Sequence, residues 1–462
     1  MLRPDDYLRA LDRFQTGAMS PAERDRWRTE RLREVLRHVM TRSRFYAGHL
    51  AGVDLSQITP RTLAALPFTT KADLQRERHA VLCGPVADAL VYYETTGTTG
   101  PATPCPRSAI DVLTSNAHVE RSWRRLFAHH FGDRMPTVAL MGPSELYAFG
   151  DTFGDVAARI GAAHVKLWPE SPRVGFAKAL RLLRELAVEV VVCAPALCLN
   201  LARAARHHGY DVRRDFGVRL FGVLGEICTP ELADNVTSVW GAHVYPTLYG
   251  SQEAHAIATG CRNGRLHVSQ LNYLVEVLDP DTGAVRGEHG TGELCLTMLI
   301  SGIKPLVRYR TGDLVSVRPG EGCGCGLAGD VVDVLGRVGD RVRIGSRACQ
   351  PAELESQVLR GLRGCLGYQV VVGPDGDALT VRLDLLPALS GDVAAACESV
   401  RRRLSAWLGV PVRVEPDDRL DPITNTGAFV SWKTARIADR RVPADAAVLA
   451  ARRAAAAHLV TS

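Results

Sequence analysis

Residues 92–104 read YYETTGTTGPATP, and this stretch decides the fold. Gly97 and Gly100 let the backbone turn and approach an anion closely, and the threonines around them offer hydroxyl donors beside the backbone N–H groups. The run lacks the Lys-Ser/Thr ending of a Walker loop and the spaced glycines of dinucleotide-binding folds. Taken alone, it predicts either a phosphate-binding loop or a flexible turn.

Three further motifs follow the loop along the chain. They are LYGSQEA at 248–254, PLVRYRTGDLV at 305–315 and LGRVGDRVRIGSRACQPAELE at 335–355. In this order the four motifs resemble the signatures of the adenylate-forming superfamily, which joins acyl-CoA synthetases, luciferases and the adenylation domains of peptide synthetases. The resemblance covers about residues 60–441 and is nearest to the phenylacetate-CoA ligase branch, which has counterparts of VEVLDPDTG and RYRTGDL.

Length and composition limit the classes of protein to which this chain can belong. A chain of 462 residues exceeds the size at which one hydrophobic core stops growing, so we expect at least two domains. The hydrophobic fraction of 46% and the charged fraction of 23% are ordinary for a globular protein. The net charge of +6 comes from dispersed Lys and Arg, which predicts no nucleic-acid partner.

The N-terminal segment MLRPDDYLRALDRF carries acids and arginines where a signal peptide has its apolar core. No apolar stretch is long enough to span a bilayer, so the sequence predicts a cytoplasmic protein without a membrane partner. In that compartment the 12 cysteines are expected to be free thiols or metal ligands instead of a disulfide framework.

The order of periodic segments predicts an α/β protein. Helices are expected up to about residue 50, including one that starts at Pro21 after Ser20. Strands such as PTVALMG, VEVVVCAP and VRLFGVLG alternate with amphipathic helices, which predicts sheets covered by helices and a β-rich subdomain at about 265–335. We expect a large N-terminal adenylation domain over residues 1–336 and a small, mobile α+β lid domain over 337–462.

The resemblance assigns the nucleotide site. The threonine loop would close over the β- and γ-phosphates of ATP, Tyr249 would lie against adenine, and Asp313 would accept hydrogen bonds from the ribose hydroxyls. Many relatives end the loop in lysine, whereas here the matching position is Thr103. The nucleotide-binding residues implied in this way are Thr95, Thr96, Gly97, Thr98, Thr99, Gly100, Gly225, Glu226, Tyr249, Gly250, Ser251, Asp313 and Arg337.

Three of the implied residues would carry the chemistry: Thr96 of the loop, Glu253 and Lys433. Glu253 would hold Mg²⁺, a hard dication that prefers carboxylate oxygen. Lys433 would contact the substrate carboxylate and the α-phosphate as a point charge, although it could instead be an exposed basic helix start. Arg308 and Arg310 are either part of the site or structural ion-pair partners.

The resemblance also implies a hinge and an acyl pocket. The hinge of the mobile lid aligns with Gly339, followed by Asp340, and glycine is the residue that best absorbs a dihedral change. The segment SELYAFGDTFGD at 144–155 offers Tyr147, Phe149 and Gly150 as a slot for a planar acid, although core packing explains these aromatic residues equally well.

A second constellation predicts a metal site. Cys261 and His267 lie in GCRNGRLH, and Cys323 and Cys325 lie in GCGCG. Three thiolates and an imidazole would make a closed tetrahedral Zn²⁺ site of structural type. Paired segments of this kind resemble a structural zinc site in some phenylacetate-CoA ligase relatives; free cysteines are the alternative.

The resemblance predicts an AMP-forming ligase that uses ATP and Mg²⁺, joins an aromatic or arylacetic carboxylic acid to CoA and forms an acyl-adenylate on the way. Ser346 stands where the family has the glycine of its pantetheine tunnel, so an amine or a carrier-protein thiol, in secondary metabolism, remains a rival acceptor. A non-catalytic nucleotide-binding subunit is the alternative of another class. We also consider a homodimer.

Overall fold

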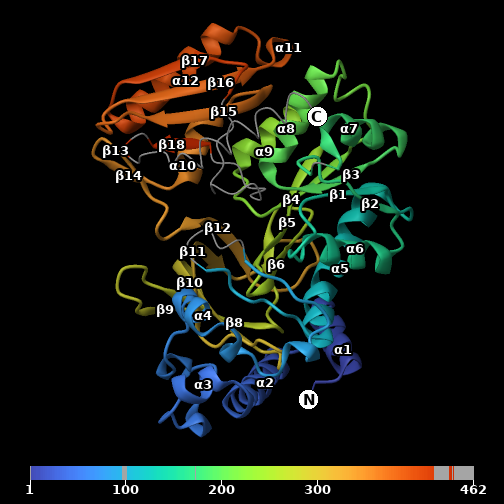
Figure 1. Ribbon diagram of the computed structural model, residues 1–462, viewed down its shortest axis with the longest axis vertical. Helices are drawn as coiled ribbons and strands as arrows, with labels where there is room; N and C mark the ends of the chain where they lie inside the picture. The colour runs from blue at the N-terminus through green and yellow to red at the C-terminus, as the bar shows by residue number, and fades with distance from the viewer. Residues whose placement is uncertain (1, 96–100, 172, 421–435, 440, 442–462) are drawn as a thin grey trace. The chain divides into compact units, whose positions relative to one another are not determined.

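The computed structural model describes residues 2–95, 101–171, 173–420, 436–439 and 441 (Figure 1). Its contacts divide the chain into two compact units. The first unit comprises Met1–Arg134, Ser144–Ile160 and Pro246–Val338, and the second comprises Met135–Pro143, Gly161–Tyr245 and Gly339–Ser462. The first unit ends within two residues of the boundary predicted at 336–337, but the second unit also takes in segments of the predicted N-terminal domain; the division into adenylation and lid domains stays a prediction.

Helix α2 of the first unit begins where the sequence supplies a cap. Ser20 caps α2, its side chain accepts from the N–H of Glu23, and Pro21 occupies the first turn, as predicted. The helices are α1 Pro4–Gln15, α2 Pro21–Arg42, α3 Arg44–His49, α4 Lys71–Glu77, α5 Ala109–Phe131 and α6 Phe149–Ile160. Short 3₁₀ turns lie at Leu55–Gln57, Leu63–Ala65, Arg78–Val81 and Val86–Asp88.

The first unit also holds the β-rich part of the chain. Its strands pair antiparallel in the order β5-β6-β7-β12-β11-β10-β8-β9, which confirms the predicted β-rich subdomain. β5 begins in the second unit and ends in the first. The strands are β5 His243–Ser251, β6 His255–Gly260, β7 Leu266–Val268, β8 Tyr273–Leu278, β9 Val285–Gly287, β10 Gly290–Met298, β11 Tyr309–Arg318 and β12 Val331–Arg337.

The second unit begins with parallel strands joined by helices. The pairing order is β2-β1-β3-β4, and the central strands are fully buried, as their continuous apolar runs predict. The elements are β1 Val138–Met141, β2 His164–Lys166, α7 Gly175–Glu185, β3 Val190–Cys193, α8 Pro195–His207, β4 Leu220–Leu224 and α9 Pro230–Trp240.

The C-terminal part of the second unit is a small α+β lobe, as predicted. Its four-stranded sheet has the order β17-β16-β15-β18. The elements are β13 Val342–Ile344, β14 Arg347–Cys349, α10 Pro351–Leu359, β15 Cys365–Val372, β16 Leu379–Leu385, α11 Pro387–Ser390, α12 Val393–Leu408, β17 Val412–Pro416 and β18 Ile437–Asp439.

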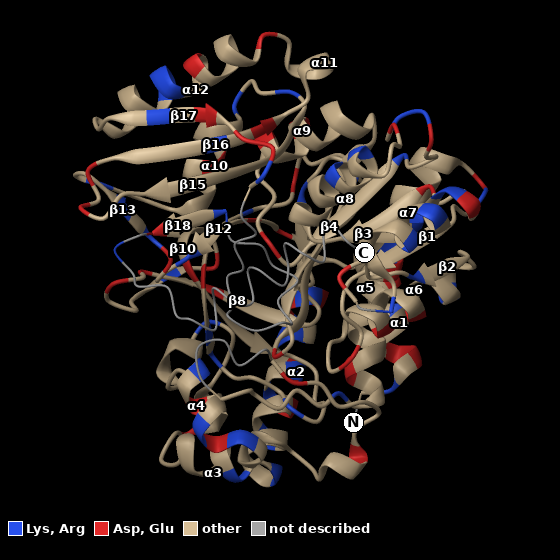
Figure 2. Ribbon diagram, turned by 45° about the horizontal axis from the view of Figure 1, so that its top comes forward, with Lys and Arg blue, Asp and Glu red and all other residues tan. Residues whose placement is uncertain are grey.

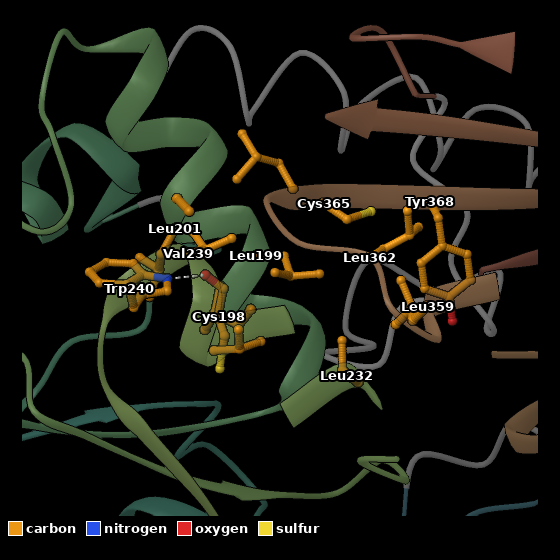
Figure 3. Close-up of a cluster of buried hydrophobic side chains, with 14 of the residues drawn as sticks. Cys198, Leu199, Leu201, Leu232, Val239, Trp240, Leu359, Leu362, Cys365 and Tyr368 are labelled. Atoms are coloured by element: carbon orange, nitrogen blue, oxygen red, sulfur yellow. Dashed lines mark hydrogen bonds between the residues drawn. The ribbon is translucent and has the colours of Figure 1, made fainter. Parts of the chain in front are cut away.

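The lobe shares one hydrophobic core with α8 and α9 (Figure 3). Leu199 and Leu232 of these helices belong to the same buried cluster as Leu359 and Tyr368 of the lobe. Asn235 of α9 adds two buried hydrogen bonds, because its amide donates to the carbonyl of Cys365 at 2.6 Å and accepts from the N–H of Cys365 at 2.9 Å. Each fully buried leucine stabilises such a contact by roughly 1.5–3 kcal/mol.

Charged residues of both signs are interspersed along the helices and loops (Figure 2). None of the helices in the described part of the chain combines the length and apolarity needed to cross a membrane.

Candidate active site

Short β-bridges hold the two ends of the threonine loop together. Thr95 and Thr103 exchange hydrogen bonds, with the N–H of Thr103 donating to Oγ1 of Thr95 at 2.9 Å and the N–H of Thr95 donating to the carbonyl of Thr103 at 3.1 Å. The N–H of Cys105 donates to the carbonyl of Tyr93 at 2.8 Å. The tip, Thr96, Gly97, Thr98, Thr99 and Gly100, lies outside the described residues, so its role in phosphate binding stays a prediction.

Glu253 lies just beyond β5 and is 7% exposed. Its carboxylate pairs with the ammonium of Lys71, the first residue of α4. Burial opposes ionisation, but the positive charges of Lys71 and Lys304 outweigh it and hold the pKa of Glu253 below its usual value. An ionised, buried carboxylate is what a bound divalent cation requires.

Lys304 places a buried cation next to the loop. It is 4% exposed, and its Nζ donates to the carbonyl of Pro104 at 2.6 Å and lies 3.5 Å from Sγ of Cys105. The sequence analysis missed both Lys71 and Lys304. They lie 182 and about 200 residues from their partners in sequence. The available sequence signals were weak: Lys71 follows two threonines at a helix start, and Lys304 directly precedes the PLVRYRTGDLV motif.

Tyr249, Asp313 and Arg337 come together as predicted for a nucleotide site. The phenol of Tyr249 donates to Oδ2 of Asp313 at 2.7 Å, and Nε of Arg337 lies 3.3 Å from Oδ1. Asp313 and Arg337 face each other across β11 and β12. Burial and then the charge of Asp313 raise the pKa of Tyr249 well above its usual value, so this phenol remains a donor at neutral pH.

Gly250 and Ser251 shape the end of β5. A Cβ on Gly250 would overlap the carbonyl of His255 in the paired strand, so only glycine fits there. Oγ of Ser251 accepts from the N–H of Ala254 at 3.1 Å and closes the turn that presents Glu253. Both residues therefore position their neighbours, and direct nucleotide contact stays a prediction.

Gly225 and Glu226 lie in the second unit, immediately after β4. Gly225 has φ of +85°, a conformation that glycine adopts without strain. Glu226 accepts from the N–H of Ala196 at 3.4 Å and pairs with Arg436 at 3.3 Å. Arg436, which the sequence analysis did not single out, also pairs with Glu355, and the arrangement fixes the loop that carries Glu226.

Of the remaining catalytic and hinge residues, only those of the hinge belong to the described part of the chain. Lys433 lies outside the described residues, and its role stays a prediction. Gly339 and Asp340 form an exposed turn after β12, and a Cβ on Gly339 would meet no atom within 4 Å. Free space around Gly339 is compatible with a hinge, which also stays a prediction.

The predicted acyl-pocket residues lie at the start of α6. Phe149 packs at 5.2 Å against Phe153, which stacks on Trp123 at 5.3 Å, so the core-packing alternative describes Phe149. A Cβ on Gly150 would overlap Ser144. Tyr147 is half-buried, and burial raises the pKa of its phenol. A substrate contact of these residues stays a prediction.

Arg308 and Arg310 are structural ion-pair partners. Arg308 is 3% exposed and holds both carboxylate oxygens of Glu276 at 2.9 Å, while Arg310 pairs with Glu293. Of the two alternatives left open for these arginines, the structural one matches the geometry.

The four predicted metal ligands meet in the first unit. The ligand atoms of Cys261, His267, Cys323 and Cys325 all lie within 4.8 Å of one another, and three of the four residues are buried. Nδ1 of His267 lies 3.0 Å from the carbonyl of Gly329, which leaves Nε2 facing Sγ of Cys325 at 3.2 Å. A backbone carbonyl on the second ring nitrogen is the usual support of a metal-binding histidine. The donor set therefore fits Zn²⁺.

Comparison with known proteins gives one family. The model of the family "AMP-binding enzyme" matches residues 24–298, more than half of the chain. The phenylacetate-coenzyme A ligase of Pseudomonas putida is 27% identical over 87% of this chain and 92% of its own, and that of Thermus thermophilus is 28% identical over 75% and 78%.

Solved structures agree on the fold. A structure of 2-hydroxyisobutyryl-CoA ligase in the postadenylation state superposes with a TM-score of 0.77 at 21% identity, covering 100% of this chain and 97% of that chain. The predicted α/β architecture with a small C-terminal α+β lobe and the predicted resemblance to phenylacetate-CoA ligases are confirmed. The chain belongs to the family of AMP-binding enzymes.

Proposed function

We propose that the chain is an AMP-forming acid–CoA ligase that activates an aromatic or arylacetic acid with ATP. The observation that carries the proposal is the ionised Glu253 held by Lys71, with Lys304 under the base of the threonine loop, in a chain of the AMP-binding family. The phenylacetate-coenzyme A ligases to which it is similar over most of its length support CoA as the acceptor.

The reaction must bring two anions together. An oxygen of the carboxylic acid attacks the α-phosphorus of ATP, the bond to pyrophosphate breaks, and a mixed anhydride of acid and AMP remains. The CoA sulfur then attacks the acyl carbon and AMP leaves. Lys304 supplies a buried positive charge at the base of the loop and Lys71 supplies another beside Glu253, which lowers the cost of gathering this negative charge.

Each remaining side chain has a binding task in this scheme. Asp313, fixed by Tyr249 and Arg337, can accept from both ribose hydroxyls, because an ionised carboxylate has two acceptor oxygens. Glu253 would hold Mg²⁺, which supplies charge neutralisation at the phosphates when bound. Lys433 would contact the acid and the α-phosphate.

The cysteine–histidine cluster would hold one structural Zn²⁺. Four protein donors fill a tetrahedral site, so the ion would leave no position for water and would tie β7 to the loop before β12. Metal analysis of the gently purified protein tests this, with about one equivalent of zinc expected. A content below about half an equivalent, unchanged in Cys323→Ser, contradicts the site.

A screen for pyrophosphate release tests the activity. Aryl, arylacetic and short alkyl acids are offered with ATP, and each reaction is repeated with CoA, with amines and with neither. Release that depends on an aryl or arylacetic acid, and a thioester that forms with CoA, support the proposal. If a product forms only with amines, the acceptor is an amine and the chain is an amide synthetase. The exposed Ser346 in the β13–β14 hairpin is compatible with that alternative. Lys433→Ala should abolish release; no release in the parent protein indicates a non-catalytic subunit.

A further inference from the structure

Arg107 is a buried arginine of the first unit that forms no ion pair with any of the described residues. Arg107 is 4% exposed, and Nε of its guanidinium has no hydrogen-bond partner within the part of the chain that the structure describes. Its one described side-chain contact with a ring places Cζ 5.2 Å from the centroid of Tyr93. Burial lowers the pKa of Arg107 from its usual value, as expected of a cation that water no longer stabilises.

The neighbouring acid Asp111 acts on this charge only through space, partly offsetting the effect of burial on the pKa of Arg107 without forming an ion pair with it among the described residues. Asp111 is fully buried, and burial raises the pKa of its carboxyl, while its oxygens accept from Ser108 and from the N–H of Ile303. A buried charge without a partner costs several kcal/mol in general, so proteins keep one where it has a binding task.

Arg107 lines a partly open cavity of about 230 Å³ between the start of α5, the start of α6 and the strand-like segment before the threonine loop. Asn116, 2% exposed, lines the same cavity with a carbonyl oxygen that has no partner, while its amide donates to Asp155 at 2.7 Å. The cavity thus presents an unpaired cation and an unpaired acceptor, two independent features that an occupant could satisfy.

The other walls limit the charge and size of the occupant. Leu90, Val91 and Val112 give an apolar wall. Asp151 and Asp155 also line the cavity, and each is already engaged, Asp151 by the phenol of Tyr93 at 2.9 Å and Asp155 by Arg159 at 2.8 Å. Two nearby carboxylates disfavour a dianion such as phosphate, whereas a monoanion can pair with the planar guanidinium through two hydrogen bonds.

We propose that this cavity is a binding site for a small organic monocarboxylate with an apolar body and a hydrogen-bond donor, its carboxylate on Arg107 and its donor on Asn116. All of its lining residues belong to the first unit, and none is among those assigned to the nucleotide or to the acyl group. Asp151, Thr152 and Asp155 of the lining do lie in the 144–155 segment that also carries the predicted acyl-pocket residues, so the site neighbours that segment without sharing its named residues.

Thermal unfolding of the full chain tests the site with three probes: 4-hydroxybenzoate, its neutral counterpart 4-hydroxybenzyl alcohol, and inorganic phosphate. A ligand that binds only the folded state raises Tm with concentration. We expect a saturable rise with 4-hydroxybenzoate and a clearly smaller one with the alcohol and phosphate. No rise with 4-hydroxybenzoate overturns the proposal.

Arg107→Met and the matched variant Arg308→Met make the test specific. Arg308 is as buried as Arg107 but is paired with Glu276, so Arg308→Met should lower Tm by several degrees and keep the shift caused by 4-hydroxybenzoate. Arg107→Met should have a Tm no lower than the parent protein and should bind 4-hydroxybenzoate about tenfold or more weakly.

Two outcomes contradict the proposal. A fall in Tm of Arg107→Met as large as that of Arg308→Met, or failure of Arg107→Met to fold, shows a structural arginine. An unchanged 4-hydroxybenzoate shift in Arg107→Met shows that this probe binds elsewhere, such as at the acyl pocket. Because the readout is binding, the result does not depend on whether the chain forms an adenylate.

Discussion

The two units hold their buried carboxylates in different ways. In the second unit, Asp384 is 1% exposed and is held by Arg206 through two hydrogen bonds of 2.9 Å and by Arg203 at 3.1 Å. In the first unit, Glu253 is held by Lys71, whose side chain is 35% exposed. Exposure does not separate the two pairs, because the side chain of Arg206 is 39% exposed. The difference lies in geometry: the planar guanidinium fixes a carboxylate through two hydrogen bonds, whereas the flexible ammonium of a lysine can exchange its partner for a ligand.

Removing Asp384 should have the largest effect on stability. Asp384→Ala removes the buried anion that Arg203 and Arg206 share, although water can still reach both arginines, whose side chains are 21% and 39% exposed. The free energy of unfolding should therefore fall by about 1–3 kcal/mol. Chemical denaturation measures it. Glu398→Ala, which removes an exposed pair with Arg401, is the matched control and should leave the free energy of unfolding nearly unchanged. If both variants lower the free energy of unfolding equally, the buried Asp384 pair has no special structural role and the contrast between the two units fails.

Glu253→Gln should lower acid-dependent pyrophosphate release by about 10²–10³-fold while the protein stays folded. The amide keeps the shape of the side chain but cannot hold a divalent cation or balance Lys71. Initial rates at saturating Mg²⁺–ATP measure the effect, and the exposed Glu30→Gln serves as control. If Glu253→Gln keeps its activity, the Lys71–Glu253 pair has only a structural role, like the pairs that Asp384 forms with Arg203 and Arg206.

Lys71→Met should move the pH profile. Glu253 has a folded-state pKa below its usual value, so it stays ionised until the pH falls through that lowered pKa. Without Lys71, burial dominates and the pKa rises, so the acidic limb of kcat/KM should shift upward by about one pH unit or more. Lys71→Arg should keep the limb in place. A limb that does not move in Lys71→Met would show that Glu253 is not the group that titrates.

The smallest effect is expected at Glu170 of the second unit. Burial and then the negative charge of Glu226 raise the pKa of Glu170 to about 7, so the folded state binds a proton that the unfolded state releases above its model value of 4.5. Stability should therefore fall as pH rises from about 5 to 8. Glu170→Gln should recover on the order of 1 kcal/mol at pH 8 and little at pH 5. Equal gains at both pH values would contradict the raised pKa.

Local sequence signals predicted the elements well. The Ser20–Pro21 helix start, the buried strand runs and the α+β order after residue 337 are all present, because capping and periodicity act over a few residues. The grouping of Cys261 with Cys325, and the placing of Tyr249 and Asp313 in one site, followed from the resemblance of their motifs to those of a known family.

Contacts between distant segments could not be derived in that way. Lys304 on Pro104, Arg436 on Glu226 and the core that the C-terminal lobe shares with α8 and α9 depend on packing of elements far apart in the chain. A lysine or arginine carries no local mark of the acid it will meet. Arg107 is the converse case, since only the structure shows that its Nε has no hydrogen-bond partner among the described residues.

Exchange of labelled pyrophosphate into ATP tests the central claim most directly. If the chain binds ATP and an organic acid together and forms a mixed anhydride, label should enter ATP only when an aryl or arylacetic acid is present, and without any need for CoA. Exchange that is absent with every acid, or equally fast without one, would contradict the account.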